Sequence, residues 1–156
     1  MTADDLQYGP VQMTKEFIHG MYVHKGEVIN QCSHFVSADI VVEFRGDPAV
    51  FPFAGQHVGI DEARSAFAAF YSVLTPPEDI SELDSFKFLE MDKSVLVWGE
   101  TMTHPIGTPM DKPIKLAIRF NFEDGWLVKF DDCFDTQEAS KHFETAEGDQ
   151  APAESD

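Results

Sequence analysis

The sequence predicts an α+β fold in which a curved antiparallel sheet wraps around N-terminal helices and encloses a cone-shaped space. Two observations predict it. Apolar residues at helical spacing are confined to the first half of the chain, and long runs of strand-forming residues follow one another in the second half. Helices segregated from consecutive strands are typical of α+β proteins. The concave face of a long curved sheet is the natural place for a pocket.

Three helices are expected, at residues 11–24, 27–35 and 62–74, because the apolar residues of each segment fall largely on one helical face. Gly26 separates the first two helices. We expect Asp61 to cap the third helix, and a Pro-Pro pair shortly after it to end it.

One strand is expected in the first half of the chain, at residues 40–44, where β-branched residues dominate. Residues 51–59 contain proline and glycine and are expected to be irregular or to form a short strand. Four long strands then follow, at residues 80–91, 95–105, 112–122 and 126–135.

The 156 residues are expected to form one domain at residues 11–143, which includes a short final helix from residue 136. Residues 1–10 are expected to be an N-terminal arm. Residues 144–156 contain five acidic residues, no basic residue and no large apolar residue. Such a segment buries too little apolar area to offset the entropy lost on ordering, so we expect a disordered acidic tail.

The composition excludes several classes of function. The formal net charge is −17, and such a surface repels nucleic acid and anionic membranes. Cys32 and Cys133 belong to no Cys-x-x-Cys motif, so we expect neither a disulfide framework nor a zinc site. No His, Asp and Glu spacing forms a metal motif, and no cofactor is expected. No apolar run reaches the ~18 residues of a membrane span and no signal peptide is evident, which predicts a cytoplasmic protein.

Two motifs carry a resemblance to a known family. The first is Phe-Ala-Gly-Gln-His-Val-Gly at residues 53–59, and the second is residues 124–135, which begin Asp-Gly-Trp-Leu-Val. On these motifs, and over most of residues 11–143, the chain resembles the SnoaL-like family of the nuclear transport factor 2-like (NTF2-like) superfamily. The resemblance implies a cystatin-like cone. The superfamily includes ketosteroid isomerases, polyketide cyclases, limonene epoxide hydrolases and catalytically silent binding modules, so a shared fold does not fix the function.

Asp132 is the first candidate for chemistry. Strand alternation places it on one face with Phe130 and Phe134, and places Asp131 and Cys133 on the other face. If the phenylalanine face points inward, burial raises the pKa of Asp132 and suits it to acid or base catalysis. The resemblance implies the same role, because the epoxide hydrolases place a water-activating aspartate at the matching point. The alternative is a structural aspartate bonded to a helix residue or to a dimer partner.

His19 and Glu100 are further catalytic candidates. The resemblance suggests His19, because the oxyanion-donating tyrosine of ketosteroid isomerases precedes a similar glycine by the same seven residues; the alternative is an ordinary half-buried histidine. Glu100 shares a strand face with Trp98, Met102 and His104. If that face is concave, Glu100 could share a proton with Asp132, whereas a slip of one residue moves it outside.

The chain also departs from the known catalytic sets. Phe44 stands at the position of the isomerase base, and Ile118 at that of its second oxyanion donor. The Arg-x-Asp of the epoxide hydrolases is matched by Gly99-Glu100-Thr101. Neither reaction is therefore assigned from the sequence.

The expected function is that of a small cofactor-independent enzyme, of isomerase, cyclase or hydrolase type, which acts by proton transfer or water activation on a small apolar molecule with a polar group. The alternative is a non-catalytic ligand-binding or dimerisation module of the same fold. A homodimer is expected, paired through an outer sheet face that carries Val95, Val97 and Leu127 or their alternates. The residues expected to line the pocket are Phe44, Phe53, Phe70, Trp98, Met102, Ile118, Phe120, Phe130 and Phe134.

Overall fold

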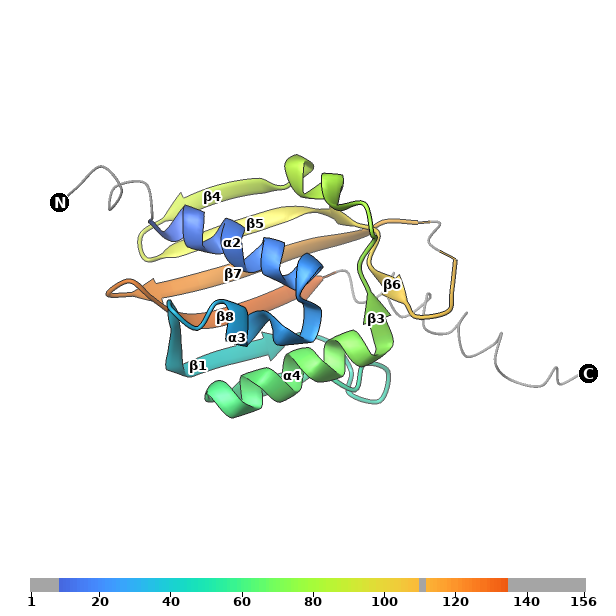
Figure 1. The fold of residues 1–156 in the computed structure, drawn as a ribbon, viewed down its shortest axis with the longest axis horizontal. Coiled ribbons are helices and arrows are strands. Elements are labelled where there is room, and N and C mark those ends of the chain that lie inside the picture. The colour runs from blue at the N-terminus through green and yellow to red at the C-terminus, as the bar shows by residue number, and fades with distance from the viewer. Residues whose placement is uncertain (1–8, 110–111, 135–156) are drawn as a thin grey trace, which may run out of the picture.

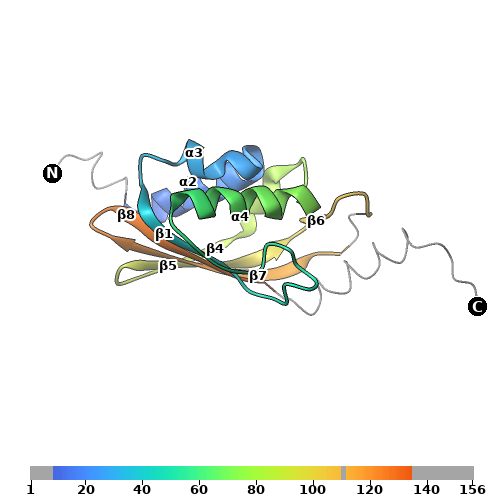
Figure 2. The same ribbon diagram turned by 90° about the horizontal axis from the view of Figure 1, so that it is seen from below.

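A layer of helices covers one face of a curved six-stranded sheet in the computed structural model, which describes residues 9–109 and 112–134 (Figures 1 and 2). The strand order is β2-β1-β8-β7-β5-β4. Strands β1 and β8 are parallel, and all the other neighbours in this sheet are antiparallel. The predicted α+β cone is thereby confirmed. The strands are β1 (Val36–Phe44), β2 (Gly55–Val58), β4 (Lys87–Met91), β5 (Ser94–Thr101), β7 (Ile114–Glu123) and β8 (Trp126–Phe134).

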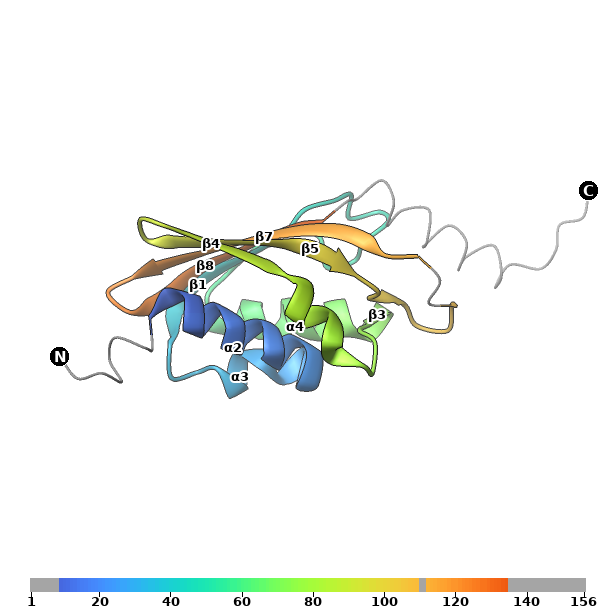
Figure 3. The same ribbon diagram turned by 90° about the horizontal axis from the view of Figure 1, so that it is seen from above.

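The helical layer consists of α2 (Pro10–Val23), a 3-10 turn η1 (Lys25–Glu27), the short α3 (Val28–Gln31) and α4 (Ile60–Val73). Figure 3 shows α2 and α4 on the same side of the sheet. The expected helix at residues 27–35 is therefore too long, and β1 begins earlier than residue 40.

The N-terminus of α4 differs from the prediction. Its N-cap is Gly59 at φ 94, and Asp61 lies within the first turn, where its carboxylate accepts a hydrogen bond from Arg64. The backbone N–H of Gly59 donates to the carbonyl of Ile40. This hydrogen bond fixes the start of α4 against β1. The positive φ that it requires at residue 59 is a conformation that glycine tolerates best.

Two of the four long strands are shorter than predicted. Ile80–Ser85 is a 3-10 helix, η2, because Asp79 caps it by accepting from the backbone N–H of Ser81. Strand β5 ends at Thr101, and His104–Pro105 forms a separate strand, β6, that pairs with β3 (Leu74–Thr75). The sequence pattern located β7 and β8 to within two residues over the described part of the chain.

The core between the helices and the sheet is filled by phenylalanine rings. Phe17 of α2 and Phe67 of α4 meet Phe130 of β8, with ring centroids 5.1 to 5.6 Å apart. Phe44 of β1 stacks on Phe70 of α4 at 5.0 Å. Each such pair contributes roughly 0.5–1.5 kcal/mol beyond the area that it buries. This region is filled by side chains, and a cavity lies toward the end of the sheet where α4, β5 and β8 finish.

The strand register decides which of the two alternative sets of residues lies on the outer face of the sheet. Val95, Val97 and Leu127 are fully buried beneath the helices. Their alternates Leu96 and Trp98 lie on the opposite face of the sheet. Residues 1–8, the helix expected from residue 136 and the acidic tail lie outside the described residues. Within the described ranges, no helix is long and apolar enough to cross a membrane.

Candidate functional site

A cavity of about 60 Å³ lies between the C-terminal halves of α2 and α4 and the end of the sheet. Its wall is largely apolar, with side chains such as Ile18, Met21, Leu74 and Leu116. Its polar wall residues are Tyr22, Thr101, Thr103 and Asp132. An apolar cavity with a few convergent polar groups is the usual form of a small-molecule site.

The structure places the residues expected to line the pocket in three different environments. Phe70, Ile118 and Phe134 line the cavity. Trp98 is 41% exposed on the outer face of the sheet, because the β5–β7 register places it opposite Ala117, and Met102 is half-buried outside the cavity wall. The remaining predicted residues do not line the cavity because they pack against other rings in the core: Phe44, Phe53, Phe120 and Phe130.

Asp132 reaches the cavity from the middle of the sheet. It lies on β8 between Phe44 of β1 and Ile118 of β7, and it is 5% exposed. Its Oδ1 atom is buried and accepts no hydrogen bond from any described residue. Burial, and secondarily the negative charge of Asp131, raise the pKa of Asp132 to about 7. A carboxyl group with this pKa is ionised in part of the molecules at neutral pH.

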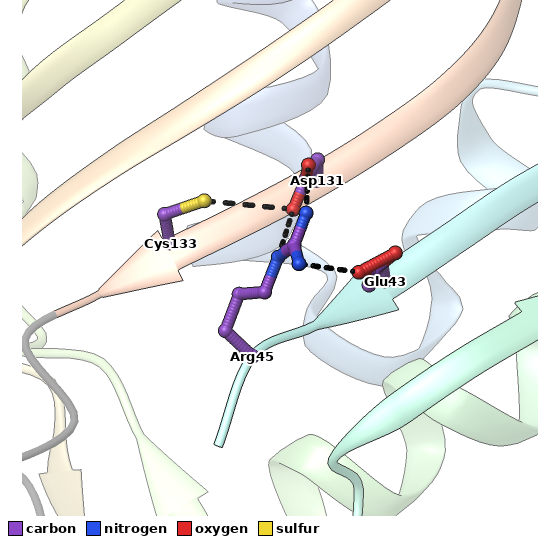
Figure 4. Close-up of polar contacts among 4 residues, drawn as sticks. All are labelled: Glu43, Arg45, Asp131 and Cys133. Carbon is purple, nitrogen blue, oxygen red and sulfur yellow. Dashed lines mark hydrogen bonds and ion pairs between the residues drawn. The ribbon is translucent and has the colours of Figure 1, made fainter.

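Asp131 has the opposite environment on the other face of the same strand (Figure 4). Arg45, just beyond β1, donates from Nε to Oδ1 at 3.0 Å and from Nη2 to Oδ2 at 2.8 Å, and its Nη1 lies 3.0 Å from Glu43. The Cys133 thiol is 3.5 Å from Oδ1. Hydrogen bonds from Arg45 lower the pKa of Asp131 although burial opposes them. Asp131 therefore remains a fixed negative charge beside Asp132.

A second polar cluster was not predicted from the sequence. The Tyr22 hydroxyl on α2 donates to Oε2 of Glu82 on η2, and Thr101 donates to the same oxygen at 2.6 Å. The backbone N–H of Met102 donates to Oε1 of Glu82 at 3.0 Å. Thr103 belongs to the same cluster because its hydroxyl group is hydrogen-bonded to that of Thr101. Burial and the Glu82 contact raise the pKa of Tyr22, so its hydroxyl stays protonated. The available signal was that a tyrosine on the inner face of a helix needs a hydrogen-bond partner.

Tyr71 of α4 is electrostatically coupled to both polar sites. Burial is the main cause of its strongly raised pKa, and Tyr22 and Asp132 raise it further. Tyr71 is therefore a neutral phenol near the cavity.

The other two catalytic candidates do not meet Asp132. Ile18, Met21 and Tyr22 turn inward on α2, which leaves His19 exposed in a separate groove of about 870 Å³ between α2 and η2. Glu100 is exposed on the outer face, opposite Lys115 in the β5–β7 register. Of the two alternatives left open for Glu100, the structure has the one that places it outside, because Thr101 is the residue that turns inward.

Within residues 9–109 and 112–134, no group of three or more His, Cys, Asp or Glu side chains could hold a metal ion.

Comparison with known proteins adds information on the fold. No family model and no curated relative matches the chain. An NTF2-like protein of unknown function from Burkholderia pseudomallei aligns with a TM-score of 0.68 at 17% identity, over 86% of this chain and 96% of that one. The chain has the NTF2-like fold.

Two further solved structures are similar to the chain. TerC, crystallised with polyporic acid, has a TM-score of 0.65 at 15% identity and covers 86% of this chain and 98% of its own. A Rhodopseudomonas palustris protein provisionally named an isomerase has a TM-score of 0.64 at 13% identity, over 83% of this chain and 91% of that one. At these identities the likeness establishes the fold alone.

Proposed function

We propose that this NTF2-like protein belongs to the SnoaL-like branch, that it binds a small, mostly apolar molecule with a polar group in the cavity, and that Asp132 exchanges a proton with it. The observation that carries the proposal is the buried Oδ1 atom of Asp132, which has no partner in the described chain and belongs to a wall residue of the cavity. A buried acceptor without a partner costs about 1–3 kcal/mol. A bound molecule that supplies a proton or a hydrogen bond removes that cost.

The surroundings of Asp132 support acid and base chemistry at neutral pH. The raised pKa leaves comparable amounts of the protonated and ionised forms near pH 7, which favours proton transfer in either direction. The apolar wall excludes bulk water and strengthens electrostatic interactions inside the cavity. Proton abstraction next to a carbonyl group and activation of one bound water are both compatible with a single carboxyl group in this setting.

One observation favours a binding module without chemistry. His19 and Glu100 lie away from the cavity, and the only other titratable residue in its described wall is Tyr22, whose proton is bound to Glu82. A catalytic site usually contains a second group that stabilises developing charge. Binding alone is therefore the second candidate.

The test compares wild type with Asp132→Asn and with Asp124→Asn, a matched control at the exposed β7–β8 turn. A panel of cyclic alcohols, cyclic ketones and 2-hydroxycyclohexanone is screened for binding by NMR, and 2-hydroxycyclohexanone is incubated in D2O to follow deuterium uptake at carbon. We expect the wild type and Asp124→Asn to accelerate the uptake and Asp132→Asn not to do so. Binding with no acceleration by the wild type would establish the second candidate, and no binding by any probe would refute both.

A further inference from the structure

The polar cluster at the cavity wall consists of Tyr22, Glu82, Thr101 and Thr103, and it has more acceptor positions than hydrogens to donate. A hydroxyl group carries one hydrogen and can accept about two hydrogen bonds, whereas a carboxylate only accepts. The Glu82 carboxylate takes the hydrogen of Tyr22 and the hydrogen of Thr101, both at Oε2. The two hydroxyl groups therefore have no hydrogen left to offer to the cavity.

Thr103 is committed in the same way. Its Oγ1 lies 2.9 Å from Oγ1 of Thr101, and since the Thr101 hydrogen points to Glu82, the hydrogen in this contact comes from Thr103. The backbone N–H of Thr103 also donates to Thr101, at 3.1 Å. The hydroxyl oxygens of Tyr22 and Thr101 lie 2.9 Å apart because both groups donate to the same Glu82 oxygen, and neither hydrogen points to the other hydroxyl group.

The oxygens of Tyr22 and Thr103 keep lone pairs that no described contact uses, while every hydroxyl hydrogen in the cluster is occupied. Glu82 enforces this polarity from outside the wall, because it accepts without lining the cavity. Its own position is fixed by the N–H of Met102, where the chain leaves β5. Tyr22 cannot then serve as a donor to an oxyanion unless Glu82 moves or takes up a proton.

We propose that the ligand carries a hydroxyl or amine group that donates to the oxygens of Tyr22 and Thr103, and that Glu82 is the positioning residue that sets this preference. This inference rests on the proposed ligand-binding cavity and names the class of molecule that it selects. Ketones, ethers and carboxylates of the same shape have no hydrogen to donate to the oxygens of Tyr22 and Thr103. Their binding is therefore disfavoured.

The test uses a pair of probes with the same ring, cyclohexanol, which donates, and cyclohexanone, which only accepts. One net hydrogen bond of about 1 kcal/mol corresponds to about a fivefold difference in affinity, so the wild type should bind cyclohexanol about fivefold more tightly by NMR titration. In Glu82→Gln the side-chain amide can donate a hydrogen to a hydroxyl oxygen that itself donates to Glu82 in the wild type. The hydrogen of that hydroxyl group can then point into the cavity, which should abolish the preference for cyclohexanol. Glu78→Gln, an exposed change four residues earlier, should keep it.

Tyr22→Phe supplies a second, independent variant. It removes one acceptor oxygen, so it should weaken cyclohexanol about fivefold and leave the affinity for cyclohexanone unchanged. Equal affinity of the wild type for both probes, or an alcohol preference that survives Glu82→Gln, overturns the inference and leaves the proposed cavity standing. Failure of both probes to bind the wild type overturns the inference and the proposed function together.

Discussion

Asp131 and Asp132 are adjacent in the chain and yet face opposite sides of one strand. Asp131 accepts two hydrogen bonds from Arg45, and Asp132 points to an apolar cavity with Oδ1 unpaired among the described residues. The pKa of Asp131 is therefore lowered and that of Asp132 is raised, which is how two carboxyl groups acquire different roles. Pleat alternation places the two side chains in these different environments.

The first prediction concerns stability and pH at Asp132. Below pH 3.8 this group is protonated in the folded and the unfolded chain alike. Between about pH 4 and 7 the unfolded chain loses the proton while the folded chain keeps it, so the free energy of unfolding falls by up to about 4 kcal/mol. Asp132→Asn is neutral in both states, and its stability relative to wild type should therefore rise across this range. Urea unfolding at pH 4, 6 and 8 measures the difference.

The comparison between the two proteins removes the contributions of other groups, such as Asp131, whose lowered pKa gives a pH dependence of opposite sign. Asp124→Asn at the exposed turn is the control and should parallel the wild type. A difference between wild type and Asp132→Asn that stays constant with pH would show that Asp132 titrates at its ordinary pKa.

At the scale of elements, Phe86 and Thr101 of β5 bring the segment after η2 and the end of β5 into the cavity wall. Phe86, which follows η2, lies over Gly99 of β5 and meets the ring of Tyr22 edge-on at 6.4 Å. A Cβ atom at position 99 would lie 2.6 Å from Cδ1 of Phe86. The cavity wall thus depends on the absence of a side chain at Gly99.

The second prediction follows from this contact. Gly99→Ala should displace Phe86 and lower the free energy of unfolding by about 1–3 kcal/mol, as is usual when a close-packed site is overfilled. Urea denaturation measures the loss. Gly9→Ala, where a Cβ would meet nothing within 4 Å, should lower the stability by less than about 1 kcal/mol, which is the difference between the two residues at a helix N-cap. Equal effects of the two substitutions would mean that Phe86 moves aside freely.

The same elements show what the sequence can and cannot predict. The alternation in β8 predicted that Asp132 faces inward, because it shares a strand face with Phe130 and Phe134. The register of β5 was not predictable, since Trp98 and Val97 are both apolar and only pairing with β7 decides which turns inward. The η2 turn was missed for a related reason. Glu82 bonds Tyr22 and Met102, which are 60 and 20 residues away, and no local pattern encodes such contacts.

At the scale of the whole molecule, the outer face of the sheet carries apolar side chains. Leu89 is 47% exposed and Trp98 is 41% exposed, with half-buried Leu96 also on this face. Apolar residues grouped on an open sheet face commonly mark an interface. We predict that two copies pair through this face, with the alternates of Val95 and Val97 in the interface.

Light scattering at micromolar concentration tests this pairing. The wild type should have twice the chain mass of 17.5 kDa, and Trp98→Lys should have the mass of one chain. Val58→Lys, an exposed apolar residue on the edge strand β2, is the control and should leave the mass unchanged. A wild type of single-chain mass would refute the pairing.

The central claim is that Asp132 is a buried carboxyl group poised to exchange a proton in a ligand cavity. Its most direct test is a carbon-13 NMR titration of the Asp132 side-chain carboxyl, assigned with Asp132→Asn and repeated in Asp131→Asn. The account predicts a midpoint near pH 7 in the wild type and a lower midpoint in Asp131→Asn, because the neighbouring negative charge is removed. A wild-type midpoint near the ordinary value of 3.8 would contradict it.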